Sequence, residues 1–176
     1  MNVSSFRLDL TPLTAGELSL ATYNFAGLEQ ALGLNVTGTT LDEELRYAMR
    51  IRLYKVLAEE SNYLWLTHWA IVHREEQRVI GFLILKGSPN EQGEVIIGYI
   101  IDESYRRQGY ATEAVSRMCG WIFQHPQALW VVADTEKDNT ASHNVLRRLG
   151  AELYRETAEL YWWRIPSPAA VQLEAR

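Results

Sequence analysis

Residues 106–112, in the second half of the chain, have the composition of an anion-binding loop. Arg106, Arg107, Gln108 and Gly109 follow a long apolar stretch and precede a segment with helical spacing of apolar residues. Positive side chains at a helix N-terminus oppose the helix dipole unless a negative ligand binds there. Glycine lets successive backbone N–H groups point at one spot, and the Thr112 hydroxyl is a further donor. The loop predicts a diphosphate site, although an ordinary strand-to-helix turn with solvated arginines would use the same residues.

Other chemistries lack their residues. The sequence contains neither G-x-x-x-x-G-K-[ST] nor G-x-G-x-x-G after a strand, so the P-loop and Rossmann patterns are absent. Cys119 is the one cysteine, and the Cys and His residues show no zinc-like spacing. We therefore expect no disulfide and no metal, and we interpret Cys119 as a packing residue.

Charge and hydropathy narrow the class of protein further. The formal net charge of −5 argues against a general nucleic-acid binder. The N-terminal segment does not resemble a signal peptide, and no run of about 18 apolar residues occurs in the sequence. We expect a cytoplasmic protein with no membrane partner.

The N-terminal part of the chain predicts a strand and two helices. Apolar residues alternate with polar ones over 6–10, which indicates a half-buried strand. Thr14 with Glu17 and Thr40 with Glu43 have capping-box spacing, and each pair precedes apolar residues at helical spacing. These pairs predict the starts of two helices.

From Leu64 onwards the pattern changes to alternating strands and helices. Residues 64–73 and 78–86 predict a β-hairpin, and the apolar run 94–102 is typical of a strand buried on both faces. A helix over 110–122 and a strand over 129–134 follow. Strand, helix and strand predict a right-handed crossover between parallel neighbours.

The C-terminal part predicts one more helix and two strands. Asp138 is a candidate N-cap for a helix that ends before Gly150. Strands over 151–156 and 158–165 close the fold, and the segment 166–176 has little to anchor it. The aromatic-rich last strand is a candidate edge for a homodimer.

Two motifs resemble those of a known superfamily. Arg106, Gly109 and Ala111 match [QR]-x-x-G-x-[GA] between a strand and a helix, the signature of the GNAT superfamily of N-acetyltransferases. The stretch IGYIIDESYRRQGYATEA resembles the branch of ribosomal-protein N-terminal (alanine or serine) acetyltransferases. The stretch DNTASHNVLRRLGA resembles that branch's second element, with Asn139 and Ser142 in matching places.

The resemblance implies a fold. It is an α/β (α+β) architecture with a mixed, mostly antiparallel twisted sheet of about seven strands, flanked by about four helices. Two central parallel strands splay apart in this fold. The similarity covers about residues 94–154, and we expect a single GNAT-like domain over 1–165 followed by a C-terminal tail over 166–176.

The resemblance also implies acetyl-CoA as the acetyl donor, bound in the splay. The diphosphate would bind backbone amides of residues 108–112, and the pantetheine arm would pair with the strand edge at 99–101. A splayed strand edge has free N–H and C=O groups for such an amide-rich arm. The full set of expected cofactor contacts is Tyr99, Ile100, Ile101, Arg106, Arg107, Gln108, Gly109, Tyr110, Ala111, Thr112, Asn139 and Ser142.

The expected catalytic residues match the family pattern only in part. Many members carry a Glu that acts as the general base on the strand before the loop. The residues expected at that place here, 95–96, are apolar. Glu94 lies nearby but would need a β-bulge to face the site. Leu146 occupies the place of the Tyr that many members use as the acid. Ser142, or a water, is then the better candidate for the acid, with Asn139 beside it near the thioester.

A site without an evident base favours an amine that is easily neutralised. A lysine costs about 4–5 kcal/mol to deprotonate at pH 7, and a chain N-terminus costs only about 1 kcal/mol. We expect direct attack in a ternary complex by an α-amine of a protein N-terminus or a small molecule. The alternative is a non-catalytic acyl-CoA-binding sensor or interaction module with the same fold. A third hypothesis is a nucleotide-phosphate binder of another fold.

Several further residues have two interpretations. The acceptor site would involve the first two helices and the final hairpin, whose aromatic and acidic residues equally suit core packing and solvated strand positions. His68 and His73 lie on opposite faces of one strand and are more typical of structural residues. Arg147 and Arg148 suit the end of a helix without any ligand, and one of them could instead reach the 3′-phosphate of CoA. The hairpin residues in question are Glu156, Glu159, Tyr161 and Trp163.

Overall fold

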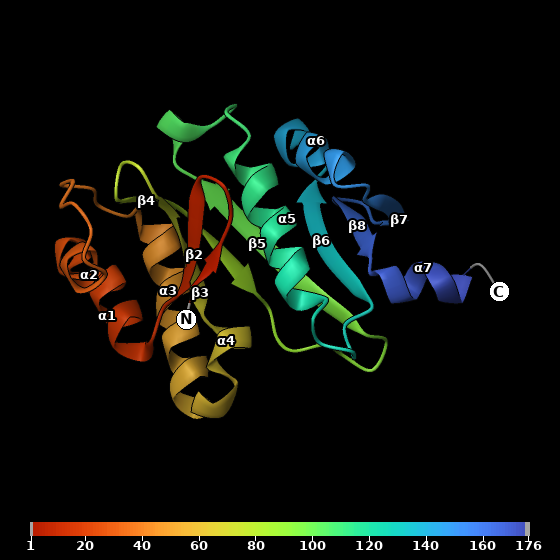
Figure 1. Ribbon diagram of the computed structural model, residues 1–176, viewed down its shortest axis with the longest axis horizontal. Coiled ribbons are helices and arrows are strands. Elements are labelled where there is room, and N and C mark those ends of the chain that lie inside the picture. Colours follow the sequence, from red (N-terminus) through yellow and green to blue (C-terminus); the bar gives the residue numbers. More distant parts are fainter. Residues whose placement is uncertain (1, 175–176) are drawn as a thin grey trace.

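The computed structural model describes residues 2–174 and is organised around one mixed β-sheet (Figure 1). The strand order is β1-β2-β3-β4-β5-β6-β8-β7, and among the described residues only β5 and β6 pair in parallel. This confirms the predicted fold class, with eight strands where about seven were expected. The strands are β1 Val3–Ser4, β2 Leu8–Pro12, β3 His68–His73, β4 Arg78–Leu85, β5 Glu94–Ile101, β6 Trp130–Glu136, β7 Glu152–Glu156 and β8 Leu160–Pro166.

The described residues form seven α-helices, which is more than the predicted four or so. The additional ones, α2, α4 and α7, are short, and α4 occupies the place where the sequence predicted the start of the strand at Leu64. Two single-turn 3₁₀ helices, Glu60–Asn62 and Glu103–Tyr105, lie before α4 and before the candidate loop. The α-helices are α1 Ala15–Tyr23, α2 Phe25–Ala31, α3 Glu43–Ala58, α4 Tyr63–Leu66, α5 Tyr110–Ile122, α6 Thr140–Arg148 and α7 Pro168–Glu174.

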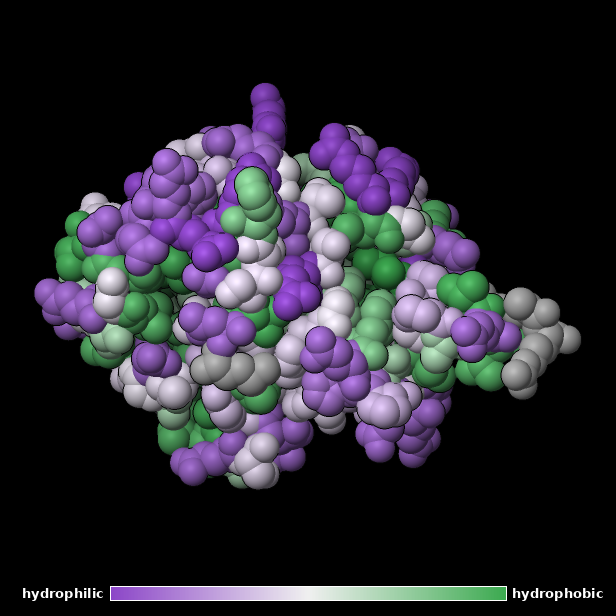
Figure 2. All heavy atoms as spheres, in the orientation of Figure 1, coloured by the Kyte–Doolittle hydropathy of each residue, from purple (hydrophilic) through white to green (hydrophobic). Residues whose placement is uncertain are grey.

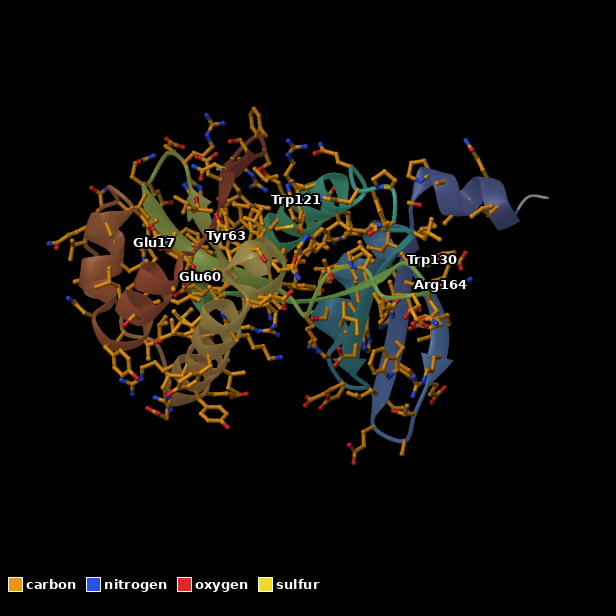
Figure 3. All side chains as sticks on the ribbon, turned by 90° about the horizontal axis from the view of Figure 1, so that it is seen from below. Glu17, Glu60, Tyr63, Trp121, Trp130 and Arg164 are labelled. Atoms are coloured by element: carbon orange, nitrogen blue, oxygen red, sulfur yellow. The ribbon has the colours of Figure 1, made fainter. Side chains whose placement is uncertain are left out.

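Strand alternation divides the core into two clusters on opposite faces of the sheet. Phe82 of β4 packs with α1, α2 and α3, and its neighbour Leu83 packs with α5 on the other face. The α5 face also holds an aromatic group, in which the Trp121 ring lies 5.1 Å from Trp69 and 4.9 Å from Trp65. Figure 3 shows Trp121 on α5, close to α4. The two faces therefore have separate hydrophobic cores.

Of the two predicted N-terminal helix starts one is confirmed and one differs, and the first strand also differs from its prediction. The Thr14 and Glu17 capping box is confirmed, but α3 begins after Asp42, whose side chain accepts a hydrogen bond from the Leu45 amide, and not at Thr40. Aspartate is a stronger N-cap than threonine, which favours the later start. Phe6 is exposed in the turn between β1 and β2, so the predicted strand starts two residues later.

The C-terminal part of the chain differs from the predictions in two places. The last strand β8 pairs with β6 and β7 on its two sides, so it is not the sheet edge that a homodimer would need. Its Arg164 guanidinium lies 4.1 Å from the Trp130 ring of β6. Figure 3 labels both side chains. The following segment, for which we expected little anchoring, forms α7, with Ser167 accepting a hydrogen bond from the buried Ala170 amide.

Within residues 2–174, no helix is both long enough and apolar enough to cross a membrane. The same residues contain no group of three or more His, Cys, Asp or Glu side chains arranged to hold a metal ion.

Candidate functional site

The two parallel strands separate halfway along their length. The strands β5 and β6 pair from Glu94 opposite Trp130 to Ile97 opposite Ala133, and their pairing ends there. Beyond that point β5 continues to Ile101 and β6 continues to Glu136. Each strand keeps its other neighbour beyond that point. The edge of β5 from residue 98 onwards therefore faces an opening between the strands.

A cleft of about 610 Å³ follows this opening. Its wall consists of the free edge of β5, the loop before α5, the first turn of α5 and one side of α6, from its N-cap to Arg148. This volume is typical of a cofactor site. The cleft brings together every predicted cofactor contact except Gln108; the lining residues are Tyr99, Ile100, Ile101, Tyr105, Arg106, Arg107, Gly109, Tyr110, Ala111, Thr112, Asn139, Ala141, Ser142, Asn144, Val145 and Arg148.

The loop before α5 has the backbone of an anion-binding turn. Arg107 and Gly109 are left-handed, with φ of 61° and 83°, and Gly109 is the N-cap of α5 without a side-chain cap. The first-turn amides of α5 thus lack the partner that a capping side chain supplies. Thr112 lines the cleft, and its hydroxyl is buried and has no hydrogen-bond partner among the described residues. Hydrophilic residues gather along this edge, over the loop and α6 (Figure 2).

Arg7, which the sequence analysis did not identify, holds this loop from behind. Its Nη1 donates to the Gln108 carbonyl oxygen at 3.1 Å, its Nε pairs with Glu113 at 2.7 Å, and its guanidinium lies 4.2 Å from the Tyr110 ring centroid. Burial raises the pKa of Glu113, but hydrogen bonds from Arg7 and Ser5 outweigh it and hold that pKa below its usual value. Arg7 therefore ties the N-terminal hairpin to both sides of the loop.

Two residues of the predicted catalytic group lie at the other end of the cleft. The Asn139 side chain is the N-cap of α6, where Asp138 was expected, and accepts a hydrogen bond from the Ser142 amide at 3.1 Å. Ser142 lies beside the Tyr99 phenol and lowers its pKa, although burial outweighs this and raises the pKa overall. The Tyr99 hydroxyl is buried without a hydrogen-bond partner of good geometry in the described residues.

The structure separates the two arginines at the end of α6. Arg148 lines the cleft, and the Arg147 guanidinium lies 5.4 Å from the ring of the buried Trp163. Arg106 is also engaged, since its Nε donates to the Ile101 carbonyl oxygen at 3.0 Å. Arg107 and Arg148 are thus the arginines best placed for an anionic ligand.

The geometry does not support Glu94 as a base. Its carboxylate accepts a hydrogen bond from Asn90 at the start of β5, and it lines neither the cleft nor a smaller cavity on the opposite face of the sheet. β5 pairs with β4 and β6 in a regular register over the described residues. It therefore lacks the β-bulge that would turn the Glu94 side chain toward the site. A strand rise of about 3.3 Å per residue places Glu94 about 13 Å from Gly98.

The other residues considered for catalysis or acceptor binding have structural roles or lie outside both cavities. Leu146, at the place of the anticipated Tyr, is buried in the core with Cys119, whose pKa burial raises to about 12. His73 is hydrogen-bonded to the Tyr110 hydroxyl at 3.0 Å on the α5 face. Trp163 is buried and donates to Thr135, and the predicted acceptor residues of the final hairpin line neither the cleft nor the smaller cavity.

The smaller cavity, of about 250 Å³, lies under α3. Tyr99 and Ile100 border both cavities, so the two meet at the free edge of β5. Sequence reasoning missed it because its walls come from segments far apart in the chain, which no local pattern connects. It is lined by Asp42, Glu44, Leu45, Ala48, His68, Phe82, Ile84, Gly98, Tyr99 and Ile100.

The left-handed loop at Arg107–Gly109 and the unpaired edge of β5 have the geometry expected of a site for an elongated cofactor with an amide-rich arm. The family comparison agrees. Residues 7–152 match the acetyltransferase (GNAT) domain, so the chain belongs to the GNAT acetyltransferase family. Within that range lie both predicted motifs and the whole cleft.

One curated relative and several solved structures are similar to the chain. The uncharacterized N-acetyltransferase YjdG of Bacillus subtilis is 28% identical over 62% of this chain, and the match spans 65% of that relative's length. RimL, a ribosomal L7/L12 alpha-N-protein acetyltransferase in complex with coenzyme A, superposes with a TM-score of 0.68 at 18% identity, covering 96% of this chain and 99% of RimL.

Two further structures show how widely the fold is used. The ribosomal-protein-S5-alanine acetyltransferase of Vibrio fischeri has a TM-score of 0.66 at 14% identity, covering 96% of this chain and 97% of that one. FdhC, a nucleotide-linked sugar GNAT, has a TM-score of 0.68 at 16% identity, covering 99% and 95%. At these identities the likeness establishes the fold and leaves the acceptor undetermined.

Proposed function

We propose that this protein transfers an acetyl group from acetyl-CoA to a primary amine in the cytoplasm, by direct attack in a ternary complex. The acceptor is an α-amine, either of a protein N-terminus or of a small molecule. The observation that carries the proposal is the continuous cleft from the left-handed loop at Arg107–Gly109, along the free edge of β5, to Ser142.

The residues present fit the donor. The backbone amides around Gly109 and the unpartnered Thr112 hydroxyl would hold the diphosphate, and Arg107 would add charge at the rim. The edge of β5 at Tyr99–Ile101 would pair with the pantetheine arm as a neighbouring strand does. Because Asn139 and Ser142 close the far end, the thioester would lie between that helix end and the edge of β5.

Acetyl transfer needs an oxyanion donor and a proton for the leaving thiolate. A backbone amide of β5 would serve the oxyanion. The Ser142 hydroxyl would supply the proton, with the protonated Tyr99 phenol beside it. Asn139 acts as a positioning residue, because its side chain fixes the first turn of α6 that carries Ser142.

In the part of the chain that the structure describes, the cleft has no evident general base, and this favours an α-amine as the acceptor. Glu94 is hydrogen-bonded to Asn90 at the other end of β5, and no carboxylate of the described residues lines the cleft. An amine with a pKa near 7.8 needs about 1 kcal/mol to lose its proton at pH 7. The same step costs a lysine about 4–5 kcal/mol.

Release of CoA thiol from acetyl-CoA tests the proposal. We expect turnover with peptides that have a free N-terminus, and none with N-blocked peptides that contain lysine. Ser142→Ala should lower kcat by about tenfold to a hundredfold with little change in the KM for acetyl-CoA. CoA-induced thermal stabilisation without turnover across the amine panel would instead support the non-catalytic sensor. Acetylation of only the blocked peptides would refute the α-amine assignment.

A further inference from the structure

The cavity under α3 has a defined relation to the reaction site. Two rows of paired residues cross β3, β4 and β5 on the α3 face, and one of them ends at Ile100. Ile100 is 42% exposed, and it borders the cofactor cleft as well as this cavity. A molecule in the cavity would therefore reach the thioester past Ile100. The rows are His68, Ile84 and Gly98, and then Ala70, Phe82 and Ile100.

The inner walls of this cavity are mainly apolar, and its mouth is acidic. Side chains of Leu45, Ala48, Phe82 and Ile84 contribute to the walls, and at about 250 Å³ the space is below the usual size of a drug-sized ligand site. It therefore suits one residue-sized group.

We infer that the cavity under α3 binds the acceptor, and that it selects an amine carried on an apolar group with positive charge further along the molecule. This inference rests on the proposed acetyltransferase function. The apolar group occupies the space beside Leu45, Ala48 and Phe82, and the reacting nitrogen lies next to Ile100.

The surroundings of His68 disfavour a cation inside the cavity. His68 is 2% exposed, lines the cavity, and has an Nδ1 without a hydrogen-bond partner in the described part of the chain. Burial and the nearby Arg52 lower the pKa of His68 to about 3. A cation bound beside His68 would meet the same burial and the same positive charge, which favours a neutral group in the inner part of the cavity.

The mouth has the opposite character. Asp42 and Glu44, at the start of α3, are exposed and border the cavity, and they attract positive charge on the part of the acceptor that stays in solvent. Glu43 lies between them but pairs with Arg46 at 2.7 Å and does not line the cavity. The two glutamates thus form a matched pair for a test.

The first experiment compares peptides that differ only at the first residue, with kcat/KM as the readout. A leucine N-terminus should exceed aspartate and lysine N-termini by about tenfold to a hundredfold, because only leucine fills the apolar space. Replacing later lysines in the peptide by glutamates should lower kcat/KM further, and added salt should reduce that difference.

The second experiment alters the walls and the mouth. Ala48→Phe fills the cavity and should lower kcat/KM for the leucine peptide at least about tenfold, while the thermal shift with CoA is retained. Ala58→Phe, at an exposed position of the same helix, is the control. Glu44→Gln should weaken the preference for lysine-rich peptides about threefold, and Glu43→Gln should not.

The outcomes separate the two proposals. If no amine is acetylated although CoA binds, the proposed function fails. If amines are acetylated but leucine and aspartate N-termini react equally, or Ala48→Phe has no more effect than Ala58→Phe, only the acceptor assignment is overturned.

Discussion

Gly109→Asp gives the most direct test of the diphosphate site. Gly109 has a φ of 83°, so any side chain there is strained by about 1–2 kcal/mol. An aspartate also places a negative charge where the diphosphate would bind. Two unit charges about 4 Å apart repel by about 4 kcal/mol at an effective dielectric constant of about 20, which corresponds to about a thousandfold in affinity. The Arg7 guanidinium, 3.5 Å from the Cβ position, offsets part of this repulsion. We expect CoA affinity to fall about 10²-fold to 10³-fold.

Gly150 provides the control for backbone strain. It has a φ of 74° and lies just after α6, and a Cβ added there would meet no atom within 4 Å, so Gly150→Asp carries the same strain without facing the cleft. Both variants should lose about 2–8 °C in Tm. Only Gly109→Asp should lose CoA binding, measured by calorimetric titration at fixed ionic strength. If Gly109→Asp binds CoA within about threefold of the unaltered protein, the diphosphate assignment is wrong.

Three further predictions address residues that the structure singles out. Arg7→Met should raise the KM for acetyl-CoA about threefold to tenfold, since the loop loses its bond to the Gln108 carbonyl; an unchanged KM would contradict this. Arg148→Ala should weaken CoA about tenfold but leave 3′-dephospho-CoA unaffected, and Arg147→Ala should affect neither; equal effects on both ligands would exclude a 3′-phosphate contact. Arg52 lowers the pKa of His68, and its charge would act in the same direction on an amine bound beside that residue. Arg52→Gln should therefore move the acidic limb of kcat against pH upwards by about half a unit or more; an unmoved limb would refute that role.

The donor side of the site was predictable because it depends on local sequence. A glycine between an apolar strand and a helix fixes where the chain turns, and the run 106–112 contains the whole turn. The structure places Arg106, Gly109 and Thr112 in one cleft with Asn139 and Ser142, as the two motifs indicated. Their roles in binding and catalysis remain predictions.

The cavity that we propose for the acceptor was not predictable as a whole, because it depends on which strands become neighbours, although the sequence analysis expected the second helix at the acceptor site. His68, Ile84 and Gly98 lie in one row only because β3, β4 and β5 pair in this register. Arg7 supports the loop from a hairpin about a hundred residues earlier, and an isolated arginine in a turn carries no local signal of that contact. The homodimer edge was misassigned for the same reason, since β8 lies inside the sheet.

The opening between β5 and β6 is maintained by the partners on their outer sides. β5 pairs with β4 as far as Ile101 opposite Gly81, and β6 pairs with β8 as far as Glu136 opposite Leu160. A Cβ at Gly81 would lie 2.2 Å from the Ile100 carbonyl oxygen, so only glycine lets β4 approach the end of β5 this closely. With both strands held outwards, hydrogen-bonding groups of β5 that would otherwise face β6 are left for a ligand. The part of the site that would contact the cofactor arm is therefore backbone, and the side chains that specify it lie one strand away.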